Sequence, residues 1–182
     1  MIIALAGRRI DASDAQERRF PLDQVPVVRQ RLQELFVRRN ASGLVCSGAC
    51  GADLLALDVA GQLGLHRRMV LPYLREQFRK ESVTDRPGDW GPLFDRIADA
   101  VAPDDLVVLQ DAGEGEAAYA AVNTVILEEA AKLAQNQHRA TAEDVLAVLI
   151  WEGTPRPGND LTAAFAEVAR AKHYDIEQIL TR

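Results

Sequence analysis

Residues 44–65 have the sequence LVCSGACGADLLALDVAGQLGL. The apolar residues 44–46 predict a short buried strand, the small residues 47–52 predict a tight turn, and an apolar stripe after Asp53 predicts a helix. Strand, glycine-containing turn and helix in this order form half of a βαβ unit. The start of such a helix leaves backbone N–H groups unpaired at the positive end of the helix dipole, so the turn is a candidate anion site. A tight turn that packs against a sheet and binds nothing has the same pattern.

The size and charge of the chain restrict what it can be. Its 182 residues are enough for one α/β domain, and because 48% of them are hydrophobic and only 5% aromatic, we expect an aliphatic core. The formal net charge is −6. A nucleic acid is therefore an unlikely partner, because general phosphate neutralisation needs a basic face. A local basic pocket for a small anionic ligand stays possible.

Cysteine and histidine usage predicts neither a metal site nor a cofactor. Cys46 and Cys50 flank the glycine turn, and the three histidines are scattered along the chain rather than placed at zinc-ligand spacing. Buried free thiols in a reducing compartment fit this usage. The N-terminal residues lack the pattern of a signal peptide, and no apolar run has the length of a membrane span. We expect a cytoplasmic protein that makes no membrane contact.

Strand and helix patterns alternate along the whole chain. Expected strands are residues 2–5, 44–46, 69–71, 106–109, 145–151 and 174–179, and expected helices are residues 27–40, 53–63, 74–80, 91–101, 117–136 and 161–172. The alternation predicts a mostly parallel sheet with right-handed crossovers and helices on both faces. Residues 145–151 are apolar throughout, as in a strand buried on both faces of such a sheet. The fold class is α/β, a single Rossmann-like three-layer sandwich over residues 1–182.

Two arginines follow the first expected strand. Ligands bind at the carboxyl ends of the strands in open α/β sheets, and the planar guanidinium of Arg8 or Arg9 suits phosphate. Alternatively, both arginines are solvated or paired with Asp11 or Asp14.

Two further connections at strand ends are long or rich in glycine. Residues 73–102 form a connection of a length that is typical of a lid or pocket wall. Residues 152–160 form a second glycine-containing loop, in which Asn159 or Asp160 is placed to cap the following helix.

These pieces together resemble the SLOG superfamily, the Rossmann-like domains shared by Lonely-Guy-type phosphoribohydrolases, the DNA-processing protein DprA and nucleotide-sensing modules. The similarity points to bacterial sensor-like members, some of which are fused to signalling or defence domains. It rests on the order and spacing of motifs that span most of the chain. They are AGRRID at 6–11, SGACGADLLAL at 47–57, LPYLREQFRKESV at 71–83, DRPGDWGPLFDRI at 85–97, AYAAVNTVIL at 118–127 and the run from Trp151 to Phe165.

The resemblance implies a domain that binds a nucleotide or nucleotide-derived small molecule at the carboxyl ends of its strands. The ligand-binding residues that it implies are Gly7, Arg8, Ser47, Gly48, Gly51, Asp53, Pro72, Phe78, Ser82, Tyr119, Asn123, Gly153, Asp160 and Thr162. Phosphate would be held by the turns at 48–53 and 153–162, aided by Arg8. For Tyr119 and Asn123, a core aromatic residue and a helix-surface amide are equally good interpretations.

One motif departs from the enzymes of the superfamily. Lonely-Guy-type hydrolases have the motif PGGxGTxEE, whose carboxylate serves cleavage of the N-glycosidic bond. If Thr162 takes the place of its threonine, Ala164 and Phe165 stand where the glutamates would be, and Asp160 and Leu161 replace the glycines. This departure weakens the interpretation as an enzyme.

Three hypotheses follow, in this order. The first is a sensor domain that binds its ligand without chemistry. The second is a nucleoside 5′-monophosphate N-glycosidase, which needs a carboxylate at the scissile bond; the candidates are Asp53, Glu152 and Asp160. The third is a non-catalytic partner-binding module. Members of the superfamily often pair, so a homodimer formed through residues 117–136 is possible by analogy.

Overall fold

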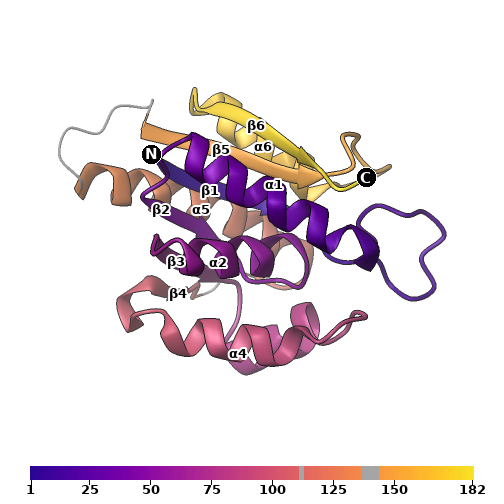
Figure 1. The fold of residues 1–182 in the computed structure, drawn as a ribbon. Coiled ribbons are helices and arrows are strands. Elements are labelled where there is room, and N and C mark those ends of the chain that lie inside the picture. The colour runs from indigo at the N-terminus through magenta and orange to yellow at the C-terminus, as the bar shows by residue number, and fades with distance from the viewer. Residues whose placement is uncertain (111–112, 137–143) are drawn as a thin grey trace.

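The computed structural model describes residues 1–110, 113–136 and 144–182 (Figure 1). Within these residues a six-stranded sheet has the order β4-β3-β2-β1-β5-β6, and every neighbouring pair is parallel. The strands are β1 (Ile2–Gly7), β2 (Gly43–Cys46), β3 (His66–Leu71), β4 (Leu106–Val108), β5 (Val145–Trp151) and β6 (Asp175–Leu180). The expected α/β class with a parallel sheet is confirmed.

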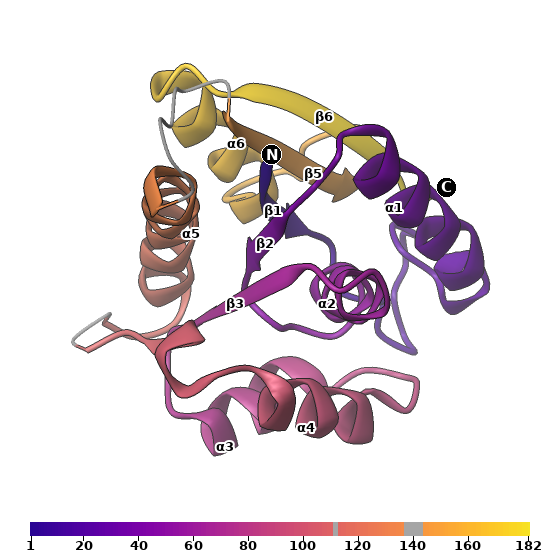
Figure 2. The same ribbon diagram turned by 60° about the vertical axis from the view of Figure 1, so that its left-hand side comes forward.

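Helices cover both faces of the sheet and complete a three-layer sandwich (Figure 2). One face carries α1 (Val25–Arg38), α2 (Ala52–Gln62), α3 (Arg75–Phe78) and α4 (Trp90–Ala100), and the other carries α5 (Glu116–Asn136) and α6 (Leu161–Ala171). Alternate residues of β1 point into two separate cores. Ile3 and Leu5 join the first core, whereas Ile2 and Ala4 join the second.

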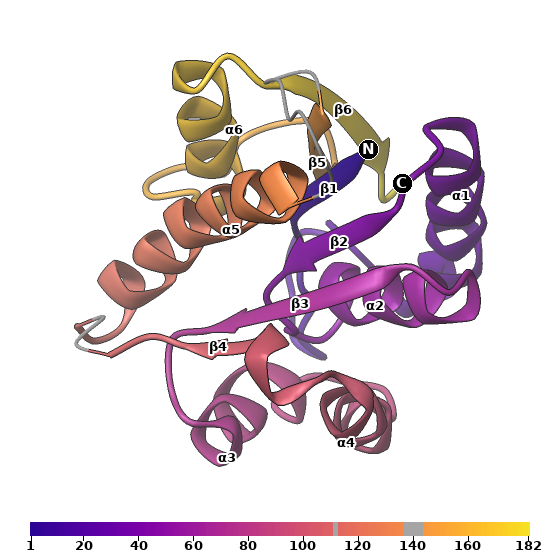
Figure 3. The ribbon, with the colours of Figure 1, turned by 90° about the vertical axis from the view of Figure 1, so that its left-hand side faces the viewer.

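The direction in which the chain adds strands reverses beside β1 (Figure 3). From β1 the chain steps through β2 and β3 to β4 at one edge, and α5 then returns it to β5 on the other side of β1. The connections that leave β1 and β5 therefore run to opposite faces, which is the topological switch point where open α/β sheets bind ligands. All seven residues of β5 are buried, as expected for an interior strand.

Some boundaries differ from the sequence expectation. A 3₁₀ turn (Leu22–Gln24) precedes α1, which begins at Val25 and includes a proline, because proline is tolerated in the first turn of a helix. The expected helix 74–80 is α3 followed by a π-helical turn, η2 (Arg79–Val83). Strand β3 begins three residues earlier than expected, since its polar first half pairs with β2. No helix in the described ranges is long and apolar enough to cross a membrane.

Candidate functional site

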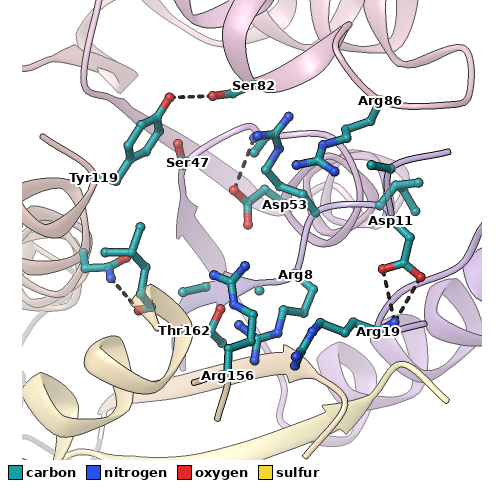
Figure 4. A pocket seen from close by; sticks show the side chains of 18 of the residues that line it. Arg8, Asp11, Arg19, Ser47, Asp53, Ser82, Arg86, Tyr119, Arg156 and Thr162 are labelled. Carbon is teal, nitrogen blue, oxygen red and sulfur yellow. Dashed lines mark hydrogen bonds between the residues drawn. The ribbon is translucent and has the colours of Figure 1, made fainter. Parts of the chain in front are cut away.

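A cleft with a volume of about 770 Å³ lies at the carboxyl ends of β1, β2 and β5, at the switch point. That volume is within the usual range for small-molecule sites. The walls are the loop after β1, the turn after β2, the segment after α3, one side of α5 and the start of α6 (Figure 4). The two glycine turns predicted from the sequence therefore lie at the same rim of the sheet.

Eight of the fourteen residues predicted to bind ligand line this cleft. They are Gly7, Arg8, Ser47, Asp53, Ser82, Tyr119, Asn123 and Thr162. They come from five separate segments of the chain, which the fold brings together. Gly48, Gly51, Pro72, Phe78, Gly153 and Asp160 are not part of the lining.

Three of those six residues face other parts of the molecule. A Cβ atom on Gly48 would lie 2.6 Å from Cε of Met69, so this glycine allows the turn to pack on the core. The side chain of Phe78 is fully buried, with its ring centroid 5.9 Å from that of Phe94. Pro72 lines a second, smaller groove beyond β3 and β4.

Two glycines are required by the backbone rather than by a ligand. Gly51 has a φ of 98°, and a Cβ atom there would lie 2.8 Å from the amide nitrogen of Ile10 and 2.9 Å from the carbonyl oxygen of Arg8. Gly153 has a φ of 94°, and its Cβ position faces Leu180. A larger residue at Gly51 would therefore disturb the fold itself.

Arg8 is only 4% exposed and binds two carboxylates of the chain. Its Nε donates to Glu152 at 2.6 Å, and its Nη1 and Nη2 each donate to Asp160 at 2.7 Å. The guanidinium also lies over the ring of Trp151, 5.7 Å from its centroid. Arg8 is thus neither solvated nor paired with Asp11 or Asp14. Its fork of donors joins β1 to the loop after β5.

Asp160 caps α6, as predicted for one of two candidate residues. Its Oδ1 accepts from the backbone N–H groups of Thr162 at 3.0 Å and Ala163 at 3.2 Å, and its Oδ2 accepts from that of Arg156 at 2.6 Å. Burial alone would raise the pKa of Asp160, but hydrogen bonds from Arg8 and these amides outweigh it and hold the pKa well below its ordinary value. The turn at 153–162 therefore already holds an anion, the carboxylate of the chain itself.

Among the three candidate catalytic carboxylates, Asp53 differs from Glu152 and Asp160 in the direction of its pKa shift. Burial alone would raise the pKa of Glu152, but hydrogen bonds, chiefly from Arg8 and also from Arg19, outweigh it and lower the pKa below its ordinary value. Glu152 is therefore ionised and paired, as Asp160 is. Asp53 is 7% exposed and lines the cleft. Burial raises its pKa to about 7, against the opposing effects of backbone N–H groups and of a nearby arginine. Asp53 is thus the one candidate that exchanges a proton near neutral pH.

The carboxylate of Asp53 also occupies the first glycine turn. Its Oδ2 accepts from the backbone N–H of Ala49 at 3.2 Å. The N–H of Cys50 donates to the carbonyl oxygen of Ser82 at 2.9 Å, and that of Ala52 donates to the carbonyl oxygen of Arg8 at 3.1 Å. These donors of the turn are engaged within the protein. A ligand phosphate in this cleft would therefore depend on side-chain donors.

Such side-chain donors are present, and the sequence indicated only Arg9 among them. Besides Arg8, the basic residues of the lining are Arg9, Arg19, Arg86 and Arg156. Arg9 pairs with Asp85, and the Nε of Arg86 lies 3.5 Å from the second oxygen of Asp85. Figure 4 shows Arg86 and Arg156 extending into the cleft from opposite sides. The position of Arg9 just after β1 identifies it as a candidate from the sequence, whereas no local sequence pattern indicates that Arg86 lines the cleft.

Three buried polar atoms of the lining have no hydrogen-bond partner among the residues that the structure describes. They are Ser47 Oγ, Arg9 Nε and Arg86 Nε. Buried polar groups are nearly always hydrogen-bonded, because an unsatisfied one loses its interaction with water without compensation. Their shared position in one cleft favours a polar or anionic occupant.

Helix α5 forms the remaining wall. The hydroxyl of Tyr119 shares a 2.7 Å hydrogen bond with Ser82 Oγ, and its ring meets that of Tyr73 edge-on at 6.1 Å. Asn123 is buried and donates from Nδ2 to the carbonyl oxygen of Leu161 at 2.8 Å, which ties α5 to α6. The apolar lining on these two helices consists of Val122, Ile126 and Leu161.

No protein-family model matches the chain. The chain is similar to a stretch of the signal recognition particle 54 kDa protein of Hyperthermus butylicus, with 27% identity over 161 residues. The aligned residues cover 86% of this chain and 26% of that protein, so the chain spans about a quarter of the length of this relative.

Proposed function

We propose that this chain is a SLOG-like domain that binds a nucleotide or nucleotide-derived small molecule in the cleft and reports on it without catalysing a reaction. The observation that carries the proposal is the set of unpartnered buried donors in a cleft at the switch point of the sheet. The name of the relative reported above specifies no ligand, so the proposal depends on the cleft and on the resemblance of the motifs.

The chemistry of the lining supports an amphipathic ligand of this class. Arginine side chains approach from the loop after β1, from the segment after α3 and from the loop after β5. Apolar side chains of α5 and α6 form another part of the wall, together with the half-buried ring of Tyr119. A nucleotide combines a phosphate, which guanidinium groups bind well, with a flat base that packs on apolar and aromatic surfaces.

A thermal-shift screen of nucleotides, their nucleosides and cyclic or ribosylated derivatives tests the proposal. A ligand at 100 times its Kd stabilises the native state by about 2.7 kcal/mol, which corresponds to a rise in Tm of about 5–10 °C for a domain of this size. Calorimetry on the hits should show at least about tenfold weaker binding by Arg156→Ala, since one charge-assisted contact is lost. Arg170→Ala, on the exposed side of α6, is the matched control. If no member of the panel raises Tm, the proposal is wrong.

One observation favours N-glycosidase activity as a second candidate function. Asp53 is a carboxyl group in the cleft whose pKa burial raises to about 7, a property that suits general acid–base catalysis. Against it, Ala164 and Phe165 stand at the two glutamate positions, and Phe165 is fully buried in the core. Incubation with nucleoside 5′-monophosphates followed by chromatography for free base separates the two functions. Base release that disappears in Asp53→Asn would establish the enzyme.

Oligomer formation, a role in signalling or defence and a cytoplasmic location stay predictions from the sequence. Helix α5 directs Val122, Ile126 and Leu133 into the core. The large apolar side chains that are exposed in the described ranges lie on other segments; they are Leu22, Val27, Val37, Leu74 and Leu180. A homodimer through α5 would therefore be formed by its polar and small residues.

A further inference from the structure

The loop at 84–89 places a carboxylate between two arginines at the edge of the cleft. One oxygen of Asp85 accepts from Nη2 of Arg9, and the other lies 3.5 Å from Nε of Arg86. Arg9 comes from the loop after β1, and Arg86 comes from the same loop as the carboxylate. All three side chains are about one-third exposed, and both arginines belong to the lining of the cleft.

This arrangement has more donors than a single carboxylate satisfies. Each guanidinium carries five N–H donors, yet within the described ranges the buried Nε atoms of Arg9 and Arg86 have no hydrogen-bond partner. Ser47 Oγ, on the same lining, is also buried without a partner. A phosphate carries more oxygens and more charge than a carboxylate and accepts bidentate hydrogen bonds from arginine. The position that Asp85 occupies is therefore better suited to a phosphate.

The other anion positions of the cleft are already filled. The carboxylate of Asp53 accepts from the turn after β2, and that of Asp160 caps α6. The guanidinium of Arg8 is held by Glu152 and Asp160, both of which are buried. The Arg9–Arg86 pair, which shares the single carboxylate of Asp85, is thus a place where an incoming anion meets donors that the described part of the chain satisfies only in part.

We propose that Asp85 holds the place of a ligand phosphate between Arg9 and Arg86, and that a phosphorylated ligand displaces it. The identity of the ligand as a nucleotide rests on the proposed function, whereas the exchange itself requires only a phosphate group. Displacement frees the loop at 84–89 from Arg9. This loop follows η2, which Ser82 anchors to the turn after β2 and to Tyr119 on α5. The exchange thereby gives a sensor its conformational response.

Calorimetry at low ionic strength with three probes tests this exchange. The probes are inorganic pyrophosphate, adenosine 5′-monophosphate and adenosine. Arg86→Gln should weaken both phosphate-bearing probes about tenfold through loss of a charge-assisted pair. Asp85→Asn should tighten both by about three- to tenfold, because a competing internal anion becomes neutral. Adenosine should bind both variants as it binds the wild type.

Two exposed ion-pair residues on α4 provide matched controls. Arg96→Gln and Asp99→Asn make the same chemical changes in residues that pair with Asp58 and Arg75, outside the cleft. Both controls should keep wild-type affinity for all probes. Circular dichroism and thermal unfolding of each variant verify that the comparison is made on folded protein.

The outcomes separate this inference from the proposed function. If Asp85→Asn binds the phosphate-bearing probes no better than wild type, or if Arg86→Gln binds them equally well, the exchange is wrong even where the nucleotide binds. If pyrophosphate shows the expected pattern but no nucleotide binds, the exchange stands and the nucleotide function is wrong. If neither these probes nor any phosphate-bearing member of the thermal-shift panel binds the wild type, both are wrong.

Discussion

Arg8 joins parts of the chain that lie far apart in sequence. Its partners Glu152 and Asp160 are 144 and 152 positions away, and the three side chains are almost fully buried. Removal of the cation would take from two buried carboxylates a charge partner that they share. Breaking a buried ion pair from one side is strongly destabilising, because the remaining charges lose their compensation.

We therefore expect Arg8→Ala to lower the free energy of unfolding by about 3–5 kcal/mol. Arg18→Ala removes an arginine whose ion pair with Asp23 is exposed, and it should change the stability by less than about 1 kcal/mol. Urea denaturation of both variants measures the difference. Equal, small effects would contradict the structural role given to Arg8.

The raised pKa of Asp53 makes the stability of the protein depend on pH. Burial raises its pKa in the native state to about 7 from an ordinary 3.8, so the native state binds this proton more tightly than the unfolded state does. The contribution of Asp53 to stability is therefore complete below about pH 4 and is lost as the pH rises through about 7. Asp53→Asn should show a flatter stability profile over this interval.

Denaturant titrations at pH 5 and pH 8 measure this effect. The stability of Asp53→Asn relative to wild type should be higher at pH 8 than at pH 5, because the variant has no buried carboxylate to ionise. Asp89→Asn changes an exposed carboxyl group that makes no capping hydrogen bond, and it serves as the control. A parallel profile for Asp53→Asn and wild type would show that Asp53 does not titrate in this range.

At the scale of elements, the junction of β2 and α2 depends on close backbone contact. Gly51 forms an isolated antiparallel bridge with Arg9, which fastens the start of α2 to the chain after β1. Its positive φ and the neighbouring backbone atoms leave no space for a side chain. The glycine that the sequence indicates as a ligand contact thus serves to hold two walls of the cleft together.

Gly51→Ala should destabilise the protein by about 2–4 kcal/mol through strain at positive φ and overpacking against backbone. Gly64→Ala provides a control, because Gly64 also has a positive φ but has no atom within 4 Å of its Cβ position. We expect it to lose only about 1 kcal/mol. Thermal or urea unfolding of both variants measures the difference, and equal losses would exclude the backbone contact as a cause.

At the scale of the whole molecule, the charge distribution favours small anions over nucleic acid. The net charge is −6, and the arginines of the cleft are interspersed with acidic side chains and paired with several of them. We expect no mobility shift of double-stranded DNA at about 0.15 M salt, where exposed charges are screened beyond about 8 Å. A shift at this salt concentration that falls steeply as more salt is added would contradict this prediction.

Local patterns were sufficient for the architecture. Periodicity reports which side of a segment is buried, and a run of buried residues such as 145–151 carries that information without its neighbours. The alternation of strands and helices then predicts a parallel sheet. In a parallel sheet the loops that follow the strands lie at the same rim, and both glycine turns are such loops. The start of β3 was missed because His66 and Arg68 are polar, and their side-chain contacts with Asp105 arise only in the folded sheet.

The roles of individual side chains required the tertiary structure. An arginine after a strand has the same local pattern whether it meets a ligand or a carboxylate, and the partners of Arg8 are supplied by β5 lying next to β1. The contribution of Arg86 to the cleft likewise depends on the packing of a long connection beside the loop after β1. Charge pairing and burial are properties of distances in space, which sequence separation does not encode.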